Sequence, residues 1–193
     1  YTAFQNTNGV RFVDGYSLKS FASAMDKLSS SVRNTLAFSL IAVLIIVVLG
    51  TLIAYLSVRR HNMAVSILDS LTMMPYIIPG SVMGIALLMG FSSKPIKLMG
   101  TAAIIILAYV LRRMPYTIRS ASAILMNIHP SVEEASMSLG ASKLKTFIKI
   151  TAPMMRGGVV SGAILSWMTI ISELSASVLL YVTRTQTMTI SIY

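Results

Sequence analysis

Cysteine is absent from the chain, and charged residues are scarce. None of the 193 residues is a cysteine, which excludes a disulfide-stabilised scaffold and metal sites built on thiolates. Only 11% of the residues are charged, whereas about a quarter are charged in a typical soluble domain. Hydrophobic residues make up 55% of the chain, and the mean hydropathy is +0.76. This composition is typical of a membrane protein.

Acidic residues are rarer still, with 6 Asp and Glu against 16 Lys and Arg and a formal net charge of +10. Such an excess is a feature of nucleic-acid-binding proteins. Here, however, apolar segments separate the basic residues into loop clusters, which is what the positive-inside bias of membrane proteins produces. We therefore expect membrane lipid, and no nucleic acid, among the partners.

Recognisable catalytic motifs are also missing. The sequence has no phosphate-binding loop, no zinc-protease motif and no nucleophile elbow. His61 and His129 lie far apart and each borders a loop, so interfacial polar residues are favoured over metal ligands. We therefore expect no catalytic residue, no metal site and no cofactor.

The first long apolar segment predicts a membrane span and its orientation. Residues 34–58 are 25 uncharged residues, enough to cross a hydrocarbon layer of about 30 Å at about 1.5 Å per residue. Arg59, Arg60 and His61 follow at once, which places this end in the cytoplasm and the amino-terminal end outside. Asp69, in the next segment, is within reach of Arg59 or Arg60, and an ion pair is expected there.

Further apolar segments bring the prediction to about four complete spans; they are residues 64–91, 98–111 and 157–183. The segment 98–111 is short for a crossing, so we expect its helix to begin nearer Pro95, with Arg112 and Arg113 snorkelling to the inner headgroups. We expect Pro115 to bend the chain into a separate interfacial helix.

Two of these spans contain residues that disturb an apolar helix. In the second span, Pro75, Pro79 and Gly80 predict a kink or a break. Transporters often place their pathway at interrupted helices, but a simple packing kink fits the sequence equally well. Glu173 lies inside the last span, where an ionisable group must face the bundle or water. We favour helix bracing over lining of the pathway for Glu173, and both remain open.

The one long polar passage between apolar segments is residues 129–153, and its capping residues predict a helical hairpin. Ser131 followed by Glu134 is a capping box, which predicts a helix start. Gly140 supplies the left-handed residue that ends this helix. Ser142 is expected to cap a second short helix. A capped hairpin of this kind can occur in any cytoplasmic loop.

The spacing within this passage is more specific. The relevant residues are Glu134, Ala135, Ser136, Gly140, Ile150, Ala152 and Pro153. They resemble the EAA loop of ATP-binding-cassette importer permeases, with the pattern E-A-A, three residues, G, nine residues, I, one residue, L-P. Ser136 and Ala152 depart from the pattern, although both are small. In that family the loop is a coupling helix that seats in a groove of the cytoplasmic ATPase. Pro153 is expected in the first turn of a third helix.

Three other segments narrow the resemblance: residues 109–116 (YVLRRMPY), 171–181 (ISELSASVLLY) and 185–193 (TQTMTISIY). They resemble ferric-iron importer permeases, and most closely the second half of those two-halved chains. Permeases for thiamine, polyamines, phosphonate and molybdate share much of the pattern and stay alternatives. No cluster of carboxylates and tyrosines at ligand spacing is present. The resemblance therefore implies that a separate binding protein delivers the ion.

The resemblance covers about residues 31–193 and implies an all-α, polytopic importer-permease core, similar to that of methionine importers, in the bacterial cytoplasmic membrane. We expect residues 1–31 to be an extracytoplasmic lead-in. Residues 32–193 would form the permease domain, truncated before its last core helix, with a coupling loop at 129–153.

The partners that the resemblance implies are a cytoplasmic ATP-binding-cassette ATPase dimer, a second permease half and an extracytoplasmic substrate-binding protein. On this interpretation the chain is a transport subunit and not an enzyme, because hydrolysis occurs in the ATPase. A passive channel or a membrane receptor is the alternative class. An intramembrane enzyme is the least favoured class, because Asp69 and Glu173 are on separate spans.

Overall fold

The computed structural model describes residues 4–8, 11–93 and 96–193, and its fold is helical apart from one β-hairpin. The elements in chain order are β1 (Gln5–Asn8), β2 (Arg11–Tyr16), α1 (Lys19–Arg59), α2 (Met63–Ile77), α3 (Gly80–Gly90), α4 (Ala102–Met126), α5 (Ser131–Ser138), α6 (Lys143–Thr146), the π-helix η2 (Phe147–Thr151), α7 (Ala152–Met154), α8 (Arg156–Ile171), α9 (Ser177–Leu180), the 3₁₀ helix η3 (Thr183–Thr185) and α10 (Met188–Ile192). Strands β1 and β2 pair antiparallel, within the segment expected to be a lead-in. The predicted all-α class is confirmed.

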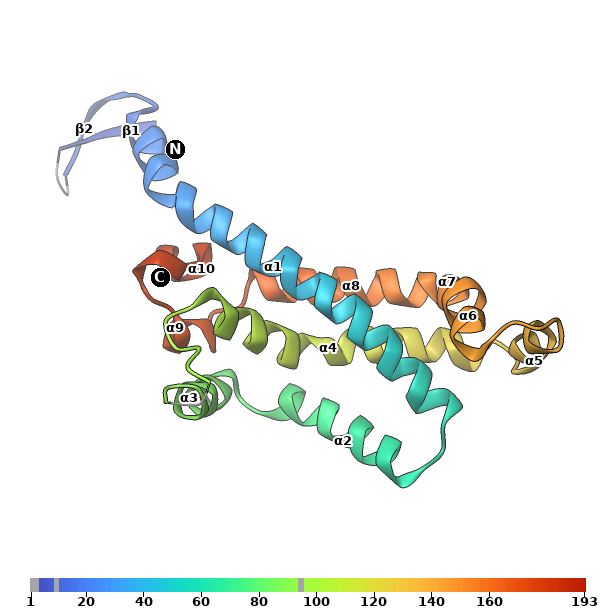
Figure 1. Ribbon diagram of the computed structural model, residues 1–193. Helices are drawn as coiled ribbons and strands as arrows, with labels where there is room; N and C mark the ends of the chain where they lie inside the picture. Colours follow the sequence, from blue (N-terminus) through green and yellow to red (C-terminus); the bar gives the residue numbers. More distant parts are fainter. Residues whose placement is uncertain (1–3, 9–10, 94–95) are drawn as a thin grey trace.

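Helix α4 is the centre of the bundle. Helix α1 crosses it, α8 runs beside it, and α2 also packs against it (Figure 1). Buried apolar side chains recur along α4 at intervals of three and four residues, as at Ile118, Ala121 and Leu125. The connection from α1 to α2 and the segment α5–α6 lie at one end of the bundle, and the β1–β2 pair and α10 lie at the other (Figure 1). The two segments that the sequence predicts to be cytoplasmic therefore lie at the same end of the bundle.

Length and composition identify the candidate membrane spans. Within the described residues, Leu28–Arg59 of α1 is long and apolar enough to cross a membrane alone. Two bent pairs qualify when each is taken as one span, namely α2 with α3 and Lys143–Met154 with Arg156–Ile171, so the total is one to three. The predicted four included residues 98–111. Most of that segment falls in α4, which is outside this set and carries three arginines.

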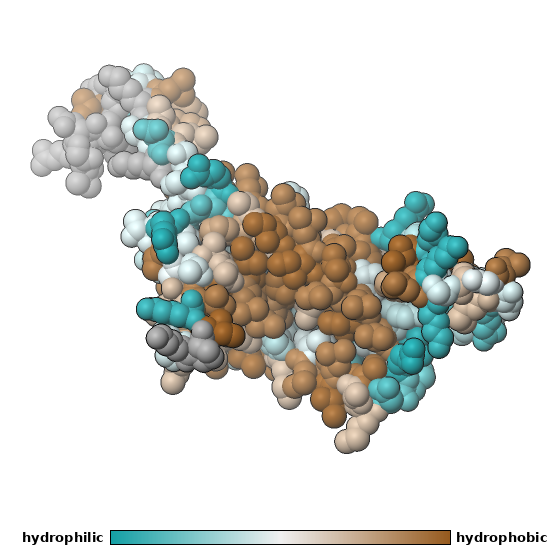
Figure 2. All heavy atoms as spheres, viewed as in Figure 1, coloured by the Kyte–Doolittle hydropathy of each residue, from teal (hydrophilic) through white to brown (hydrophobic). Residues whose placement is uncertain are grey.

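The surface of the bundle matches a bilayer. The exposed large apolar residues of α1 between positions 36 and 52 are Leu36, Leu40, Ile41, Leu44, Ile45, Val48, Leu49 and Leu52. Figure 2 shows apolar surface over the middle of the molecule and hydrophilic residues gathered toward its ends, most clearly at the end that carries α5 and α6. An apolar surface this continuous is rare on a soluble monomer, and it suits contact with lipid.

The structure of α4 differs from three expectations, which concern Pro115, the start of the helix and its two adjacent arginines. It runs without a break from Ala102 to Met126 with Pro115 inside it, so no separate interfacial helix forms. Pro115 removes one backbone donor, but it is buried in a helix packed on several sides, and such packing tolerates proline in membrane helices. The helix begins at Ala102; the start expected near Pro95 lies outside the described residues. The two arginines expected to snorkel instead point to a buried acid, described below.

Helix α8 packs closely on α4 because two glycines face it. A Cβ atom added at Gly162 would lie 2.6 Å from Thr117 Cα, and one at Gly158 would overlap the carbonyl oxygen of Ser120. The hydroxyls of Ser120 and Ser161 are 2.7 Å apart across the same interface. Small residues and interhelical hydrogen bonds of this kind hold helices together in lipid, where burial of apolar surface contributes little.

We expect Gly162→Leu to destabilise the permease by roughly 1–3 kcal/mol, because the larger side chain would push against the backbone of α4. Gly157→Leu is the matched control, since a Cβ atom there meets nothing within 4 Å. Unfolding of the full permease by SDS in mixed micelles measures the difference. Equal stability of the two variants would show that α8 does not depend on this close approach.

Candidate functional site

The predicted hairpin forms at the end of the bundle where α1 meets α2 (Figure 1). Gly140 has φ +86°, so it is the left-handed residue that the sequence predicted. The Ser142 hydroxyl accepts a hydrogen bond from the backbone N–H of Lys145 at 3.3 Å, which confirms the predicted cap of the second helix. The turn and the second cap therefore follow from local sequence.

The predicted capping box at the start of α5 is wrong. Pro130 occupies the N-cap position, and no side chain caps the helix. Pro130 already has helical backbone angles, φ −58° and ψ −27°, so Ser131 lies inside the helix rather than before it. The Ser131 hydroxyl instead lies 2.8 Å from Nδ1 of His129. Glu134 is exposed to solvent, and no cap holds it.

The acid that ties the hairpin to the bundle is Glu133. Its carboxylate accepts hydrogen bonds from Arg59 Nε at 2.8 Å and from the Tyr55 hydroxyl at 3.1 Å. Arg59 also donates to the backbone carbonyl of Ile128 at 2.8 Å. The Tyr55 ring packs against Phe147 of the π-helix with centroids 4.7 Å apart. The end of α1 that leads into α2 therefore contacts both α5 and η2.

Ser136 explains one departure from the family pattern. Its hydroxyl lies 2.9 Å from that of Thr146, and both residues are buried, so this hydrogen bond joins α5 to α6. Alanine at this position would leave Thr146 without the partner. Ser136 lies one helical turn after Glu133, and each makes a side-chain hydrogen bond to another element, whereas Glu134 and Ala135 are exposed. This spacing was visible in the sequence and could have identified Glu133.

Ile150 and Pro153 lie where the hairpin rejoins the bundle. Pro153 has no backbone N–H, and the N–H of Ala152 bonds to the carbonyl of Phe147, five residues back, which is the wide turn of a π-helix. Pro153 does sit in the first turn of α7, as predicted. However, α7 continues the preceding helical path, and the 67° bend comes two residues later, at Met155. Ile150 is half-buried and Pro153 is exposed.

Asp69 forms an ion pair, although with a different partner from the one expected. Its carboxylate accepts from Arg119 at 3.2 Å and from the Ser57 hydroxyl at 3.3 Å. Arg59 is directed toward α5 instead, so the prediction of a pair between Asp69 and Arg59 or Arg60 is wrong. The pair joins α2 to α4, two elements whose proximity the sequence did not reveal.

The second group of predicted residues meets deep in the bundle. Glu173 is 4% exposed, and its carboxylate pairs with Arg112 at 2.5 Å and with Arg113. The backbone N–H of Ala176 also donates to it, at 3.3 Å. Glu173 is not inside a helix, because α8 ends at Ile171 and the chain unwinds before α9. The prediction of a regular span over residues 157–183 is therefore wrong at this point.

The break between α2 and α3 lies against the same ion cluster. The two helices are bent by 114°, which confirms the predicted interruption. A Cβ atom added at Gly80 would lie 2.7 Å from Nη1 of Arg112, so only glycine fits beside the guanidinium. Gly80 and Glu173, predicted on separate spans, are thus brought together. Pro79 is exposed beside Gly80, and Pro75 is half-buried about one turn earlier in α2.

The cluster carries more positive than negative charge. Two guanidinium groups share one carboxylate, and among the described residues the Nε atoms of Arg112 and Arg113 are buried without a hydrogen-bond partner. Buried charge is stable only when it is paired, so these contacts hold α4 firmly to the α8–α9 link. Two adjacent arginines after an apolar run imply an acid elsewhere, and this signal could have predicted the pairing. No group of three metal-ligating side chains occurs in the described part of the chain.

Comparison with known proteins gives a consistent result. Residues 46–193 match the family described as binding-protein-dependent transport system inner membrane component. The chain is 32% identical over 189 residues to the ferric transport system permease protein FbpB of Actinobacillus pleuropneumoniae, covering 98% of the chain and 26% of that protein. It is 33% identical over 156 residues to a putative FbpB of Haemophilus influenzae, covering 81% and 25%.

A further relative has a different named substrate. The molybdate/tungstate transport system permease protein WtpB of Pyrococcus abyssi is 32% identical over 146 residues, covering 76% of the chain and 58% of that protein. The chain spans about a quarter of the length of the two ferric permeases that it matches.

We expect Glu173→Gln to destabilise the permease by roughly 3–5 kcal/mol, because it leaves two buried guanidinium groups without a counter-charge. The double variant Glu173→Gln with Arg112→Gln returns the cluster to its original net charge and should recover part of the loss. Glu134→Gln, at an exposed carboxylate, is the control and should change little. SDS unfolding measures all three, and an unchanged Glu173→Gln would contradict the bracing role.

Proposed function

The chain belongs to the family of binding-protein-dependent transport system inner membrane components, and we propose that it is the membrane-spanning permease part of an importer driven by a partner ATPase. In this role the chain is the transport subunit, and ATP hydrolysis would occur in the partner ATPase. A cytoplasmic ATPase dimer, a second permease half and an extracytoplasmic substrate-binding protein would complete the assembly. The projecting α5–α6 hairpin is the observation that carries this proposal.

The hairpin exposes apolar side chains that suit a protein partner. Leu139 is 90% exposed, Leu144 67% and Ile148 57%, at the polar end of the molecule. Apolar residues gathered on a projecting polar element are typical of an interaction surface. We propose that they seat in the ATPase together with the exposed Glu134 and Ala135.

The hairpin is built to move as a unit with α1. The Ser136–Thr146 hydrogen bond fixes α5 to α6, and the Glu133–Arg59 ion pair fixes α5 to the end of α1. When ATP binding closes the ATPase dimer, the hairpin would carry this displacement to the spans. Such coupling requires that the hairpin contacts the two ATPase states with different free energies. Ile150 and Pro153 would set the angle at which the hairpin meets α8.

We assign Glu173 to bracing rather than to the pathway, because both of its carboxylate oxygens already accept charged donors. Gly80 would serve the same junction by letting the α2–α3 break approach Arg112. Pro75 and Pro79 would favour the break by removing backbone donors from α2 and its end.

Ferric iron is the proposed cargo. Its support is the resemblance to two proteins named as ferric transport permeases, at 32% and 33% identity. Molybdate or tungstate is the alternative, because WtpB is 32% identical over 76% of the chain. With no metal-ligating group of three among the described residues, the ion would reach the membrane on the binding protein.

We expect Gly140→Pro and Ala135→Arg to reduce transport to background while membrane insertion persists. Proline cannot adopt the φ of +86° that the turn requires, and an arginine at Ala135 would place charge on the docking face. Ala123→Arg, the same replacement at an exposed position of α4, is the matched control. Uptake is measured in vesicles that contain the full permease, ATPase and binding protein. Normal uptake by both hairpin variants would remove the lever mechanism.

The candidate substrates can be distinguished in the same vesicles. We expect uptake of labelled ferric iron that requires enclosed ATP, and no uptake of molybdate or sulfate. ATP-dependent uptake of molybdate without uptake of iron would show that molybdate is the cargo, and the proposal of an ATP-driven importer would still hold. Uptake that proceeds without ATP would instead indicate a passive channel, and retention of no ATPase in mild detergent would support the same conclusion.

A further inference from the structure

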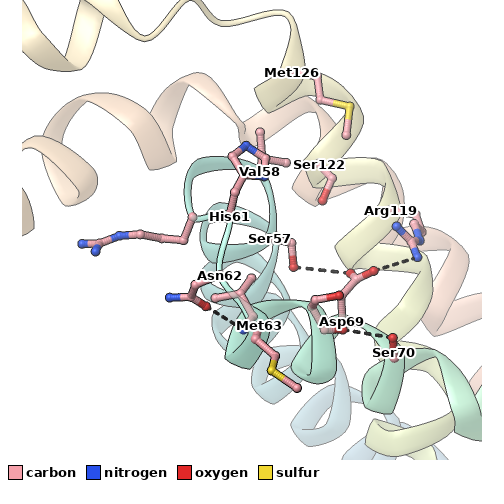
Figure 3. Close-up of a pocket in the computed structure, with 13 residues that line it drawn as sticks. Ser57, Val58, His61, Asn62, Met63, Asp69, Ser70, Arg119, Ser122 and Met126 are labelled. Atoms are coloured by element: carbon pink, nitrogen blue, oxygen red, sulfur yellow. Dashed lines mark hydrogen bonds and ion pairs between the residues drawn. The ribbon is translucent and has the colours of Figure 1, made fainter.

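A polar pocket of about 490 Å³ lies where α1, α2 and α4 meet (Figure 3). Residues of the buried ion cluster do not line it, and Arg60 of its wall also borders a second hollow beside Glu133 and Glu134 of α5. Its volume is within the range of about 300–1,000 Å³ that is usual for small-ligand sites. The polar residues of its wall that matter here are Arg60, His61, Asn62, Asp69, Arg119 and Ser122. Arg60, His61 and Asn62 come from the α1–α2 connection, Asp69 comes from α2, and Arg119 and Ser122 come from the facing side of α4.

The pocket has an excess of positive charge. Asp69 is the one acid among its described lining residues, and its two oxygens accept from Ser57 at 3.3 Å and from Arg119 at 3.2 Å (Figure 3). Arg119 and Asp69 therefore balance each other. Arg60 remains as a second cation, exposed at the end of α1. The wall keeps a net positive charge even with His61 neutral.

Hydrogen-bond donors in the wall are left over as well. In the part of the chain that the structure describes, the side chains of Arg60, His61 and Ser122 make no hydrogen bond. Asn62 uses its carbonyl oxygen to cap α2, accepting from Val65 N at 2.9 Å, and this leaves its amide hydrogens for a ligand. Unused donors beside an uncompensated cation suit the oxygens of an anion, and a phosphate group in particular.

An apolar track leads away from the pocket. Met63, in its wall, is 81% exposed, and the stripe continues along α2 through Ile67, Leu71 and Met74, which are 48–55% exposed. Spacings of four, four and three residues place these side chains on one helix face. A soluble anion would leave this track unused. An amphiphile would fill both parts, with its charged group in the pocket and its acyl chain against α2.

We propose that this pocket binds the phosphate headgroup of an anionic phospholipid from the cytoplasmic leaflet, with an acyl chain along the exposed face of α2. Basic pockets between helices on the cytoplasmic side are suited to such headgroups. The assignment depends on the membrane orientation of the chain and not on its cargo or its ATPase. A bound lipid would fix α2 against α4 at the cytoplasmic end, opposite the break that leads into α3.

Native mass spectrometry of the full permease tests this, with phosphatidylglycerol, phosphatidylcholine and soluble glycerol phosphate as probes. We expect one phosphatidylglycerol to bind at least about fivefold more tightly than phosphatidylcholine, and Arg60→Gln to remove about that factor, as one cation near a membrane surface contributes. Arg156→Gln is the matched control, because it removes an exposed charge from the same side of the membrane without touching the pocket. Retention of the helical circular dichroism spectrum verifies that each variant is folded.

Other results would contradict the proposal of a lipid site. Met63→Ser should lower the affinity for phosphatidylglycerol and leave the affinity for glycerol phosphate unchanged. If glycerol phosphate instead binds tightly, depends on Arg60 and competes equally with lipid, the pocket is a site for a free anion. If Arg60→Gln and Arg156→Gln lower the phosphatidylglycerol affinity equally, the binding is general attraction between a basic surface and anionic lipid, and not a specific site. Because uptake is not measured, failure here is distinct from failure of the importer proposal.

Discussion

The pairing of Glu173 with Arg112 and Arg113 constrains three parts of the chain at once. An ionised group at membrane depth is tolerated only when opposite charge and hydrogen bonds accompany it. The arginines lie on α4, the acid lies in the unwound link between α8 and α9, and Gly80 lets the α2–α3 break approach Arg112. Two interrupted helices therefore meet at one ion cluster, and regular helix gives way where the charges must meet.

At the other end of the bundle, charge pairing serves a different purpose. The Glu133–Arg59 pair is 12–13% exposed and joins two rigid elements, α5 and α1, across the base of the hairpin. The apolar residues Leu139, Leu144 and Ile148 of the hairpin are exposed. The hairpin is thus attached on one side through this pair and exposed on the other.

Local sequence predicted those features whose cause is local. The left-handed Gly140, the Ser142 cap and the break after α2 each depend on a few adjacent residues. Features set by distant contacts were missed. Pro115 sits in an unbroken helix because the surrounding bundle supports it, and Glu133 rather than Glu134 faces the bundle because of a partner 74 residues away. The family resemblance pointed to the hairpin, but it could not show that Glu133, and not Glu134, forms the ion pair with α1. That difference depends on how α5 packs.

The π-helix η2 has a mechanical consequence for the segment before it. One wide turn contains an extra residue relative to an α-helix, in which each residue rotates the chain by about 100°. If the wide turn were regularised to α-helical geometry, α5 and α6 would swivel by about that angle around the axis that leads toward α8. The wide turn of η2 therefore sets the rotational position at which the hairpin leaves the helical path toward α8.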